Sequence, residues 1–297
     1  MLSILIPVYN YNVFTLVETL YYQVLKCNIP FEIVCLDDAS DVFLPENQKI
    51  NQFKNSTYSV LEKNIGRSAI RNLLAKKAIY ENLLFLDADT IPVHDKFISN
   101  YISHINASEK VVYGGILYKT SKPSANELLR WIYGKKREAL HVSDRKKNPH
   151  LSFLTLNFLI KKSLFSTVTF NENIPNLRHE DTLFSYELMQ NKIEIIHIKN
   201  PVYHLGIEDS KTFLKKSEEA VVGLKNLVDS NLISSDYVKL SHYFQIIKKY
   251  NLQSIIAFGF KIIRPLFLKQ LLGKKPSLFI FDIYRLGYYC TLKKYAK

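Results

Sequence analysis

The sequence predicts an α/β fold with a mostly parallel central sheet flanked by helices, and a helical extension at its C-terminal end. Short apolar runs alternate with segments of helical periodicity in the first third of the chain, which is typical of strand–helix–strand units. Acidic side chains follow two of these runs directly. Residues 248–297 hold eleven Lys and Arg against the single acid Asp282, most of the net charge of +13, which indicates a basic appendage on a nearly neutral body.

The first two predicted strands bring a pair of acids to one edge of the sheet. Residues 2–8 form an apolar run rich in Ile and Val and predict a core strand. Residues 13–27 have helical spacing, and residues 31–36 predict a second strand that ends in Asp37 and Asp38. Open α/β sheets bind ligands at the carboxyl ends of their strands, so these acids are candidate site residues.

A third predicted strand, residues 58–61, leads to a turn that suits an anion. The turn contains Gly66 and Arg67 and opens a helix predicted over residues 68–81. Backbone N–H groups and the helix dipole favour a phosphate at such a terminus, where Arg67 or Arg71 adds positive charge. The alternative is an ordinary helix N-terminus, because neither a glycine-rich dinucleotide motif nor a Walker-type motif is present.

The fourth run, residues 83–86, ends in Asp87 and Asp89, which fall at the same predicted edge. Two carboxylates one residue apart repel each other, so the pair indicates either a divalent cation or a solvated turn. Mg²⁺ and Mn²⁺ prefer oxygen ligands and commonly bridge a protein carboxylate to substrate phosphates. Three segments that converge on one edge favour a site for a nucleotide phosphate and a metal.

The later elements are predicted from further apolar runs and helical spacing. They are strands over residues 110–118, 151–160 and 193–202, and helices over residues 182–190, 211–230 and 236–250. Residues 119–149 form a basic, Ser-rich segment with the single tryptophan, Trp131, which either stacks on an acceptor sugar or anchors a long loop.

Three polar residues near the later elements have more than one interpretation. Glu180 and Asp181 precede the helix over residues 182–190, and their spacing alone predicts acids stabilised by the helix dipole. His204 follows the strand over residues 193–202, where a lone histidine is more often structural. Beside a carboxylate-bound cation it becomes a nitrogen donor, which suits Mn²⁺ better than Mg²⁺.

The basic tail alternates apolar aromatic runs with Lys and Arg. No stretch is long enough without charge to predict a spanning helix. Apolar faces flanked by cations favour helices that lie on an anionic membrane surface, here through residues 248–297. The alternatives are a helical cap packed on the body of the protein or a surface for a protein partner.

The cysteines and the start of the chain favour a reducing compartment. Cys27, Cys35 and Cys290 are too few and too scattered for a disulfide framework. The first residues carry no basic leader, and their apolar run is too short for a signal peptide. We therefore expect a cytoplasmic protein that is peripheral on the cytoplasmic face of the membrane.

Five motifs in this order resemble the inverting family 2 glycosyltransferases, which have the GT-A (nucleotide-diphospho-sugar transferase) fold. The motifs are residues 3–10 (SILIPVYN), 36–40 (LDDAS), 64–72 (NIGRSAIRN), 87–89 (DAD) and 180–181 (ED). The resemblance covers residues 1–210, which implies a GT-A domain there and a helical, basic extension over residues 211–297. It implies a hexosyltransferase-type enzyme that depends on Mn²⁺ or Mg²⁺.

The resemblance also implies a role for each matching residue. Pro7 and Tyr9 border the nucleotide base, Asp38 accepts a hydrogen bond from it, and Arg71 lies near the base and phosphates, together with Asn64 or Arg67. Asp87, with Ala88 beside it, faces the ribose or the donor sugar. Asp89 binds the metal that bridges the diphosphate, and His204 completes the metal site.

For the reaction, the resemblance implies that Asp181 is the catalytic base and that Glu180 holds the acceptor. Family members frequently have Trp or Gly just before this Glu-Asp pair, whereas this chain has Arg178 and His179. The donor implied is a nucleotide-diphosphate sugar, with UDP favoured. The acceptor implied is a glycan or a lipid-linked molecule in surface polysaccharide synthesis.

Two other functions fit parts of the sequence. Residues 86–90 (LDADT) also match the Asp-x-Asp-x-Thr signature of haloacid-dehalogenase-like phosphatases, but three predicted strands precede the motif and no glycine is followed by Asp. A non-enzymatic basic adaptor for membranes or nucleic acid is supported only by the charge of the tail, which lacks a nucleic-acid-binding motif. No nucleic-acid partner is therefore expected.

Overall fold

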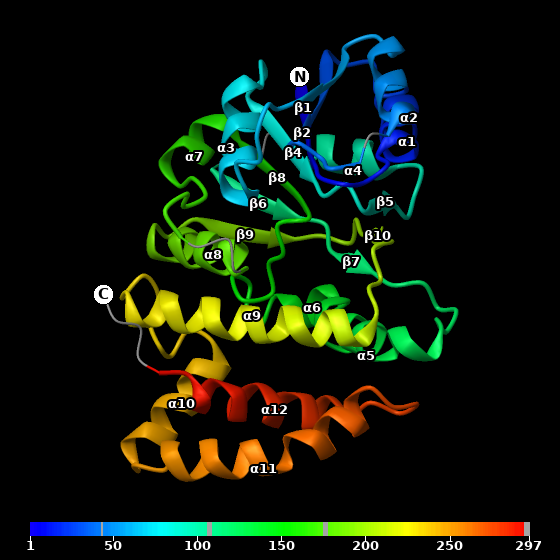
Figure 1. Ribbon diagram of the computed structural model, residues 1–297. Coiled ribbons are helices and arrows are strands. Elements are labelled where there is room, and N and C mark those ends of the chain that lie inside the picture. Colours follow the sequence, from blue (N-terminus) through cyan, green and yellow to red (C-terminus); the bar gives the residue numbers. More distant parts are fainter. Residues whose placement is uncertain (43, 106–108, 175–177, 294–297) are drawn as a thin grey trace. The chain divides into compact units, whose positions relative to one another are not determined.

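The computed structural model describes residues 1–297 except 43, 106–108, 175–177 and 294–297. The chain forms two compact units, each assembled from three segments (Figure 1). Unit 1 contains Met1–Tyr118, Ala139–Glu172 and Glu187–Gly206, and unit 2 contains Lys119–Glu138, Asn173–Tyr186 and Ile207–Lys297. The division of the sequence into domains 1–210 and 211–297 stays a prediction.

The main feature of unit 1 is a seven-stranded, mostly parallel sheet with the strand order β3-β2-β1-β4-β8-β6-β9. Its strands are β1 (Leu2–Val8), β2 (Phe31–Asp37), β3 (Ser56–Val60), β4 (Asn82–Leu86), β6 (Lys110–Tyr113), β8 (Asn157–Lys161) and β9 (Glu194–His197). Only β8 runs antiparallel to its neighbours, β4 and β6. The α/β fold class predicted from the sequence is confirmed.

Helices cover both faces of this sheet, which explains why its central strands are apolar on both sides. The helices and short turns of unit 1 are α1 (Phe14–Leu25), α2 (Pro45–Gln48), η1 (Lys49–Gln52), α3 (Arg67–Lys77), α4 (Phe97–Ile102), α6 (Val142–Arg145) and α7 (Lys162–Thr167). Figure 1 shows α3 and α7 on one face and α1 and α4 on the other. All residues of β1 except Pro7 are buried, as the continuous apolar run predicts.

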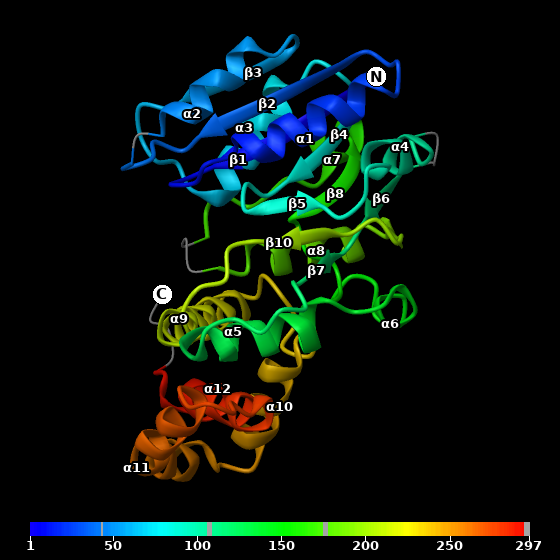
Figure 2. The same cartoon turned by 90° about the vertical axis from the view of Figure 1, so that its right-hand side faces the viewer.

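A small second sheet extends unit 1 with the order β5-β10-β7 (Figure 2). Its strands are β5 (Thr90–Pro92), β7 (Ile116–Leu117) and β10 (Val202–His204). Strand β10 pairs antiparallel with β5 and parallel with β7. Strand β5, which follows β4 directly, is therefore hydrogen-bonded to β10, about 110 residues later in the sequence.

Three predicted strands differ from the structure. The prediction over residues 110–118 splits at Gly114 and Gly115 into β6 and β7, and that over residues 193–202 splits into β9 and β10. Strand β8 covers only residues 157–160 of the strand predicted over 151–160, and it continues to Lys161. The buried Asn157 side chain donates to the carbonyls of Gly115 (3.0 Å) and Asn200 (3.1 Å), so it holds both breaks together.

Unit 2 is helical. Its elements are η2 (Ala125–Glu127), α5 (Leu128–Tyr133), η3 (Gly134–Glu138), the first part of α8 (Glu180–Gln190), α9 (Ser210–Asp229), α10 (Lys239–Lys249), α11 (Gln253–Leu271) and α12 (Leu278–Thr291). The Trp131 indole donates to the Lys119 carbonyl (3.0 Å), so it anchors the basic segment. In the described part of the chain, no helix has the length and apolar character needed to cross a membrane.

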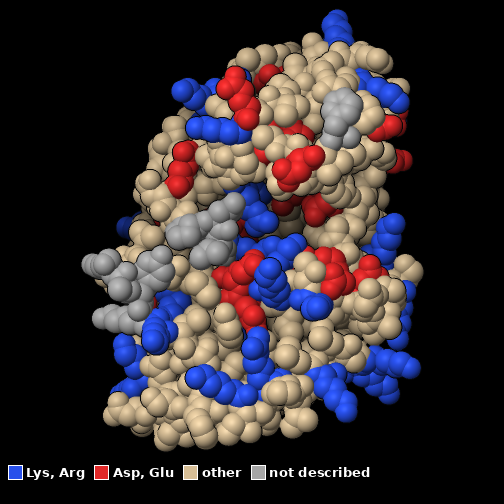
Figure 3. Space-filling model, viewed as in Figure 1, with Lys and Arg blue, Asp and Glu red and all other residues tan. Residues whose placement is uncertain are grey.

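Two apolar clusters hold these helices together. The first contains Leu183 of α8, Val221 and Leu224 of α9, and Tyr289 of α12. The second contains Leu129, Leu214, Phe260, Leu271, Phe281 and Tyr284. Figure 3 shows Lys and Arg side chains over the part of the molecule formed by α11 and α12, on the face that it presents.

The contact between α11 and α12 depends on a small residue. A Cβ atom on Gly287 of α12 would lie 2.4 Å from Cδ2 of the buried Phe260 ring on α11. A Cβ atom on Gly259, one residue away on α11, would meet no described atom within 4 Å. Gly287 therefore lies in a tightly packed contact, whereas Gly259 lies next to open space.

This difference predicts opposite effects of the same substitution. Gly259→Ala should raise the free energy of unfolding by up to about 1 kcal/mol, because alanine favours the helix. Gly287→Ala should gain the same helix preference but lower the net free energy of unfolding by about 1–2 kcal/mol, because the methyl group overpacks Phe260. Urea unfolding followed by circular dichroism measures both. Equal effects of the two substitutions would contradict the packing of α11 on α12.

Candidate functional site

Four carboxylates lie at one edge of the unit 1 sheet. Strands β2 and β4 flank β1 in parallel, so their carboxyl ends point the same way. Asp37 and Asp38 come at the end of β2, and Asp87 and Asp89 follow β4. The convergence predicted from the sequence is present within this unit.

The Asp37 carboxylate is hydrogen-bonded within the protein. It accepts a hydrogen bond from the Tyr58 hydroxyl (2.5 Å) and another from the Ser40 amide (2.8 Å). Asp37 is 2% exposed, so both partners compensate the burial of its charge. In turn, burial and the bond to Asp37 raise the pKa of Tyr58 well above its usual range.

Asp38 holds the turn that leads into α3. One carboxylate oxygen accepts from the Ile65 amide (2.7 Å) and the other from the Gly66 amide (2.9 Å). The Asn64 side chain donates to the Asp38 carbonyl (3.0 Å). Gly66 has φ +87°, which a side chain would disfavour, and it is the residue before the first turn of α3. A carboxylate offers about four lone-pair sites, so Asp38 retains capacity for one more donor.

Arg71 and Asp87 form an ion pair. The Nη2 atom of Arg71 lies 2.7 Å from Oδ1 of Asp87, and its Nη1 atom donates to the Arg67 carbonyl (3.2 Å). The guanidinium also lies over the Phe170 ring, 5.4 Å from its centroid. Burial raises the pKa of the Asp87 carboxyl, Arg71 opposes this shift, and the carboxylate of Asp89 adds to it. Arg71 therefore holds Asp87 in place and favours its charged form.

Asp89 and His204 meet where the two sheets come together. The Oδ2 atom of Asp89 lies 3.3 Å from Nε2 of His204. The pairing of β5 with β10 sets Thr90 opposite His204, and the Leu205 amide donates to the Asp89 carbonyl (2.8 Å). A Cβ atom on Gly206 would lie 2.5 Å from Oδ2 of Asp89, so only glycine leaves this carboxylate its position.

The donor set of this pair fits a divalent cation. It offers a carboxylate and an imidazole, and Nδ1 of His204 is buried with no hydrogen-bond partner in the described part of the chain. Mn²⁺ accepts both donor types. No group of three or more His, Cys, Asp or Glu side chains arranged to hold a metal occurs among the described residues. Further ligands would therefore come from substrate phosphates and water.

The remaining predicted donor residues lie near the same strands. Pro7 is in β1, and Ala88 separates the two acids that follow β4. Tyr9, just after β1, is 48% exposed, and its hydroxyl donates to Asp41 (2.7 Å). This hydrogen bond raises the pKa of the Tyr9 hydroxyl. The hydroxyl is thus engaged, while the ring stays largely open to solvent.

Sequence reasoning missed two residues of this region. Tyr11 is close enough to Asp89 for that carboxylate to add to the effect of burial in raising the pKa of the tyrosine. Gly206 makes room for Asp89, as described above. The signals that could have found them are the tyrosine in the turn after β1 and the glycine two residues after His204.

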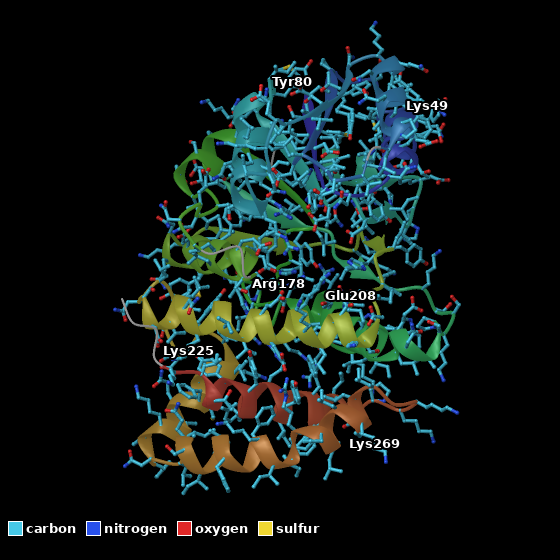
Figure 4. All side chains as sticks on the ribbon, in the orientation of Figure 1. Lys49, Tyr80, Arg178, Glu208, Lys225 and Lys269 are labelled. Atoms are coloured by element: carbon cyan, nitrogen blue, oxygen red, sulfur yellow. The ribbon has the colours of Figure 1, made fainter. Side chains whose placement is uncertain are left out.

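Glu180 and Asp181 belong to unit 2, at the start of α8. Arg178 and His179, directly before them, both have left-handed backbones, with φ +69° and +71° (Arg178 is labelled in Figure 4). Such conformations are costly for residues with side chains and are maintained only by their surroundings. The Nδ1 atom of His179 lies 2.9 Å from the Thr182 hydroxyl, one turn into the helix.

The surroundings of His179 keep it neutral. Burial and the nearby Arg285 lower its pKa to about 4. The Asp181 carboxylate accepts from the amide of Thr182 (2.7 Å). The helix thus starts from a strained two-residue turn that a neutral histidine ties to Thr182. The donor residues belong to unit 1, so the joint action of the two sets stays a prediction.

The architecture of unit 1, with acids at the carboxyl ends of β2 and β4, is that of the GT-A glycosyltransferases. The family model "Glycosyl transferase family 2" matches residues 3–169, more than half of the chain. The chain belongs to this family. These findings do not support the phosphatase or the adaptor interpretation.

Known proteins agree with this family and fold. An uncharacterized glycosyltransferase of Rickettsia felis is 30% identical over 123 residues, which are 37% of this chain and 20% of that protein. The match thus spans about a fifth of that relative's length. The crystal structure of S. aureus TarS has a TM-score of 0.53 at 18% identity and covers 96% of this chain and 54% of TarS. The mannosyltransferase PcManGT from Pyrobaculum calidifontis has a TM-score of 0.55 at 12% identity and covers 98% and 84%.

The Arg71–Asp87 pair predicts a pH-dependent effect of removing the arginine. The pKa of Asp87 is raised in the folded protein, so its ionisation lowers stability as pH rises from the unfolded value of 3.8. Arg71→Leu removes the opposing charge and should move that pKa further upward. The loss of unfolding free energy should therefore be small near pH 4 and reach about 1–3 kcal/mol at neutral pH.

The matched control is the double substitution Arg71→Leu with Asp87→Asn. It is compared with Asp87→Asn alone, because both of these variants lack the titrating group. The cost of Arg71→Leu in that background should not change with pH over the same range. Urea unfolding at both pH values measures the effect. A loss of equal size at the two pH values for Arg71→Leu alone would contradict this account of the pair.

Proposed function

We propose that this chain is an inverting, metal-dependent glycosyltransferase of the hexosyltransferase type that uses a nucleotide-diphosphate sugar as donor. The observation that carries the proposal is the Asp89–His204 pair beside the Arg71–Asp87 pair at the carboxyl end of β4. Asp89 and His204 offer ligands for a cation. Asp87 supplies a carboxylate that is held in place by the positive charge of Arg71. A diphosphate sugar needs both kinds of group.

Each donor-binding residue has a proposed task that suits its geometry. Tyr9, whose ring is exposed, borders the base together with Pro7. Asp38 uses its remaining lone-pair capacity to accept from the base. Asp87, held by Arg71, accepts from a hydroxyl of the ribose or donor sugar. Three further residues, Asn64, Arg67 and Ala88, belong to the proposed donor-binding set.

The metal would be held by Asp89 and His204, and its identity would be Mn²⁺ or Mg²⁺. When bound, the cation neutralises the charge that develops on the leaving nucleoside diphosphate. The imidazole of His204 favours Mn²⁺ over Mg²⁺. PcManGT, which shares the fold, has a structure in complex with GDP-Man and Mn²⁺, and this supports the proposed cofactor.

Asp181 is the proposed catalytic base, and Glu180 is proposed to hold the acceptor. Asp181 takes the proton of the acceptor hydroxyl as its oxygen attacks the anomeric carbon from the face opposite the leaving group. No covalent nucleophile takes part, so the configuration inverts. The tie between His179 and Thr182 supports this role, because it fixes the first turn of α8 that carries Asp181.

UDP is the proposed nucleotide, and a glycan or lipid-linked molecule in surface polysaccharide synthesis is the proposed acceptor. TarS, a protein of the same fold, has been solved in complex with UDP-GlcNAc, which supports the choice of nucleotide. We further propose a position on the cytoplasmic face of a membrane, held through residues 248–297. The last four of these lie outside the described residues.

The donor site predicts a metal-dependent response to nucleotides. UDP with Mn²⁺ should raise the melting temperature of the full chain more than either alone, because a ligand of the folded state stabilises it by mass action. Asp89→Ala should abolish the Mn²⁺-dependent part of the shift. Asp181→Asn should keep the shift yet lower turnover of a UDP-sugar by about 10²–10⁴-fold. A thermal-shift panel and a UDP-release assay measure the two effects.

Asp95→Ala is the matched control, because Asp95 is an exposed acid shortly after Asp89. It should leave both the shift and the turnover unchanged. If Asp89→Ala and Asp181→Asn both retained full transferase activity, the proposed site would be wrong. If neither UDP nor another nucleoside diphosphate shifted the melting temperature with Mn²⁺, the proposed donor class would be wrong.

A further inference from the structure

Helix α11 of unit 2 carries a row of large apolar side chains on its outer side. Ile255, Phe258, Ile262 and Leu266 are between 64% and 68% exposed. Their spacing of three or four residues places them on one face of the helix. We call these four residues the ridge. A Cβ atom on Gly259, four residues after Ile255, would meet no described atom within 4 Å, so the ridge has an open position at its centre.

The ridge is not needed to hold α11 on the protein. The other side of the helix buries Phe260 and Leu271 in the cluster that contains Phe281 and Tyr284 of α12. The Arg264 side chain bonds to the Tyr284 hydroxyl (3.2 Å) and to Glu218 of α9 (2.9 Å). The helix is thus already packed and tied on its inner side. Contiguous exposed apolar residues of this size mark an interaction surface.

The charges around the ridge are positive. Six exposed lysines lie on α11 or within a few residues of its ends: Lys248, Lys249, Lys261, Lys269, Lys274 and Lys275. None of them forms an ion pair with a described residue. Figure 4 labels Lys269 on α11, with its side chain directed away from the helix. The surface that bears the ridge therefore combines apolar side chains with uncompensated cations.

The acids of this region are already engaged. Asp282 is the only Asp or Glu from residue 237 to the end of the sequence. It accepts from Arg137 at 2.7 Å, and Glu218 is paired with Arg264. A partner of opposite charge is therefore required to complement this surface.

The chemistry of the ridge decides between possible partners. A second copy of the chain that used the same face would bring lysines against lysines, which is unfavourable. Nucleic acid would meet the cations, but three of the four ridge side chains are aliphatic, and Phe258 alone does not give successive bases a stacking surface. Anionic lipid headgroups match the lysines, and the boundary of the acyl chains accepts Ile, Leu and Phe.

We propose that the ridge is a membrane-binding surface, with α11 lying along an anionic bilayer and its four apolar side chains entering the headgroup region. This inference deepens the peripheral location in the proposed function and names the surface responsible. It does not depend on the donor site, because every residue of the ridge is in unit 2. Vesicle binding and nucleotide binding can therefore succeed or fail separately.

The test is sedimentation of the full-length chain with vesicles. One set of vesicles contains phosphatidylglycerol and phosphatidylcholine in equal parts, and the other contains phosphatidylcholine alone. The chain should bind the anionic vesicles, should bind the neutral ones at least roughly tenfold more weakly, and should lose affinity as salt is added. The double substitution Phe258→Ser with Ile262→Ser should weaken binding to anionic vesicles by roughly tenfold or more.

Two further variants sharpen the test. Ile79→Ser is the matched control, since Ile79 is 70% exposed but lies in unit 1, and it should bind vesicles as the unmodified chain does. Gly259→Leu adds an apolar side chain at the open position of the ridge and should strengthen binding several-fold, by roughly tenfold at most. An unchanged UDP and Mn²⁺ thermal shift verifies that each variant is folded.

Three results would overturn the proposal. One is the absence of binding of the unmodified chain to anionic vesicles. Another is equal binding of the Phe258→Ser, Ile262→Ser variant and the unmodified chain. The third is self-association in sedimentation velocity that this double substitution abolishes, which would make the ridge a contact between copies of the chain. In each case a normal nucleotide shift would leave the proposed transferase function standing.

Discussion

The compensation of four carboxylates at one sheet edge is the constraint on which the structure of unit 1 depends. Parallel packing of β2, β1 and β4 brings Asp37, Asp38, Asp87 and Asp89 to that edge. Asp37 and Asp38 are buried and the other two are partly buried, so each carboxylate needs a donor or a cation. Tyr58 and backbone amides serve the acids after β2, and Arg71 serves Asp87. Among the described residues, the Asp89 carboxylate has the weakest compensation, one contact of 3.3 Å with His204. The acid with the least protein support is thus the one best suited to a cation.

These contacts also explain the local structure around the edge. Asp38 fixes the turn before α3 through two amides, and Arg71 from the first turns of α3 reaches back to Asp87. The contact between Asp89 and His204 needs the small sheet, because the pairing of β10 with β5 places His204 opposite Thr90. Secondary structure that looks peripheral in the topology therefore sets the geometry of the proposed metal ligands.

The sequence predicted the elements whose hydrophobic pattern is local. Strands β1, β2 and β4 follow from continuous apolar runs, and α9 and α10 follow from helical spacing. It did not predict the breaks at Gly114 and at residues 198–201, because these depend on the distant Asn157 side chain. Contacts between residues distant in the sequence were likewise not predicted in the site. The acids were evident from the motif, whereas the Asp89–His204 contact and the role of Gly206 depend on strand pairing between distant segments.

In unit 2 the sequence predicted amphipathic helices and a basic tail, but not which apolar side chains would be covered. The packing of Phe260 against Gly287 turns one face of α11 inward and leaves the ridge outside. Composition alone could not separate these two faces, since both are apolar. The proposed membrane surface, predicted from the sequence over residues 248–297, is thereby narrowed to the four side chains of the ridge.

The central claim is that Asp89 and His204 bind the metal of a nucleoside diphosphate. Anomalous diffraction at the manganese edge from crystals grown with UDP and Mn²⁺ tests it most directly. The account predicts one strong peak bonded to the Asp89 carboxylate, to the His204 imidazole and to diphosphate oxygens. A manganese ion bound to UDP without either side chain, or UDP bound away from the carboxyl ends of β2 and β4, would contradict it.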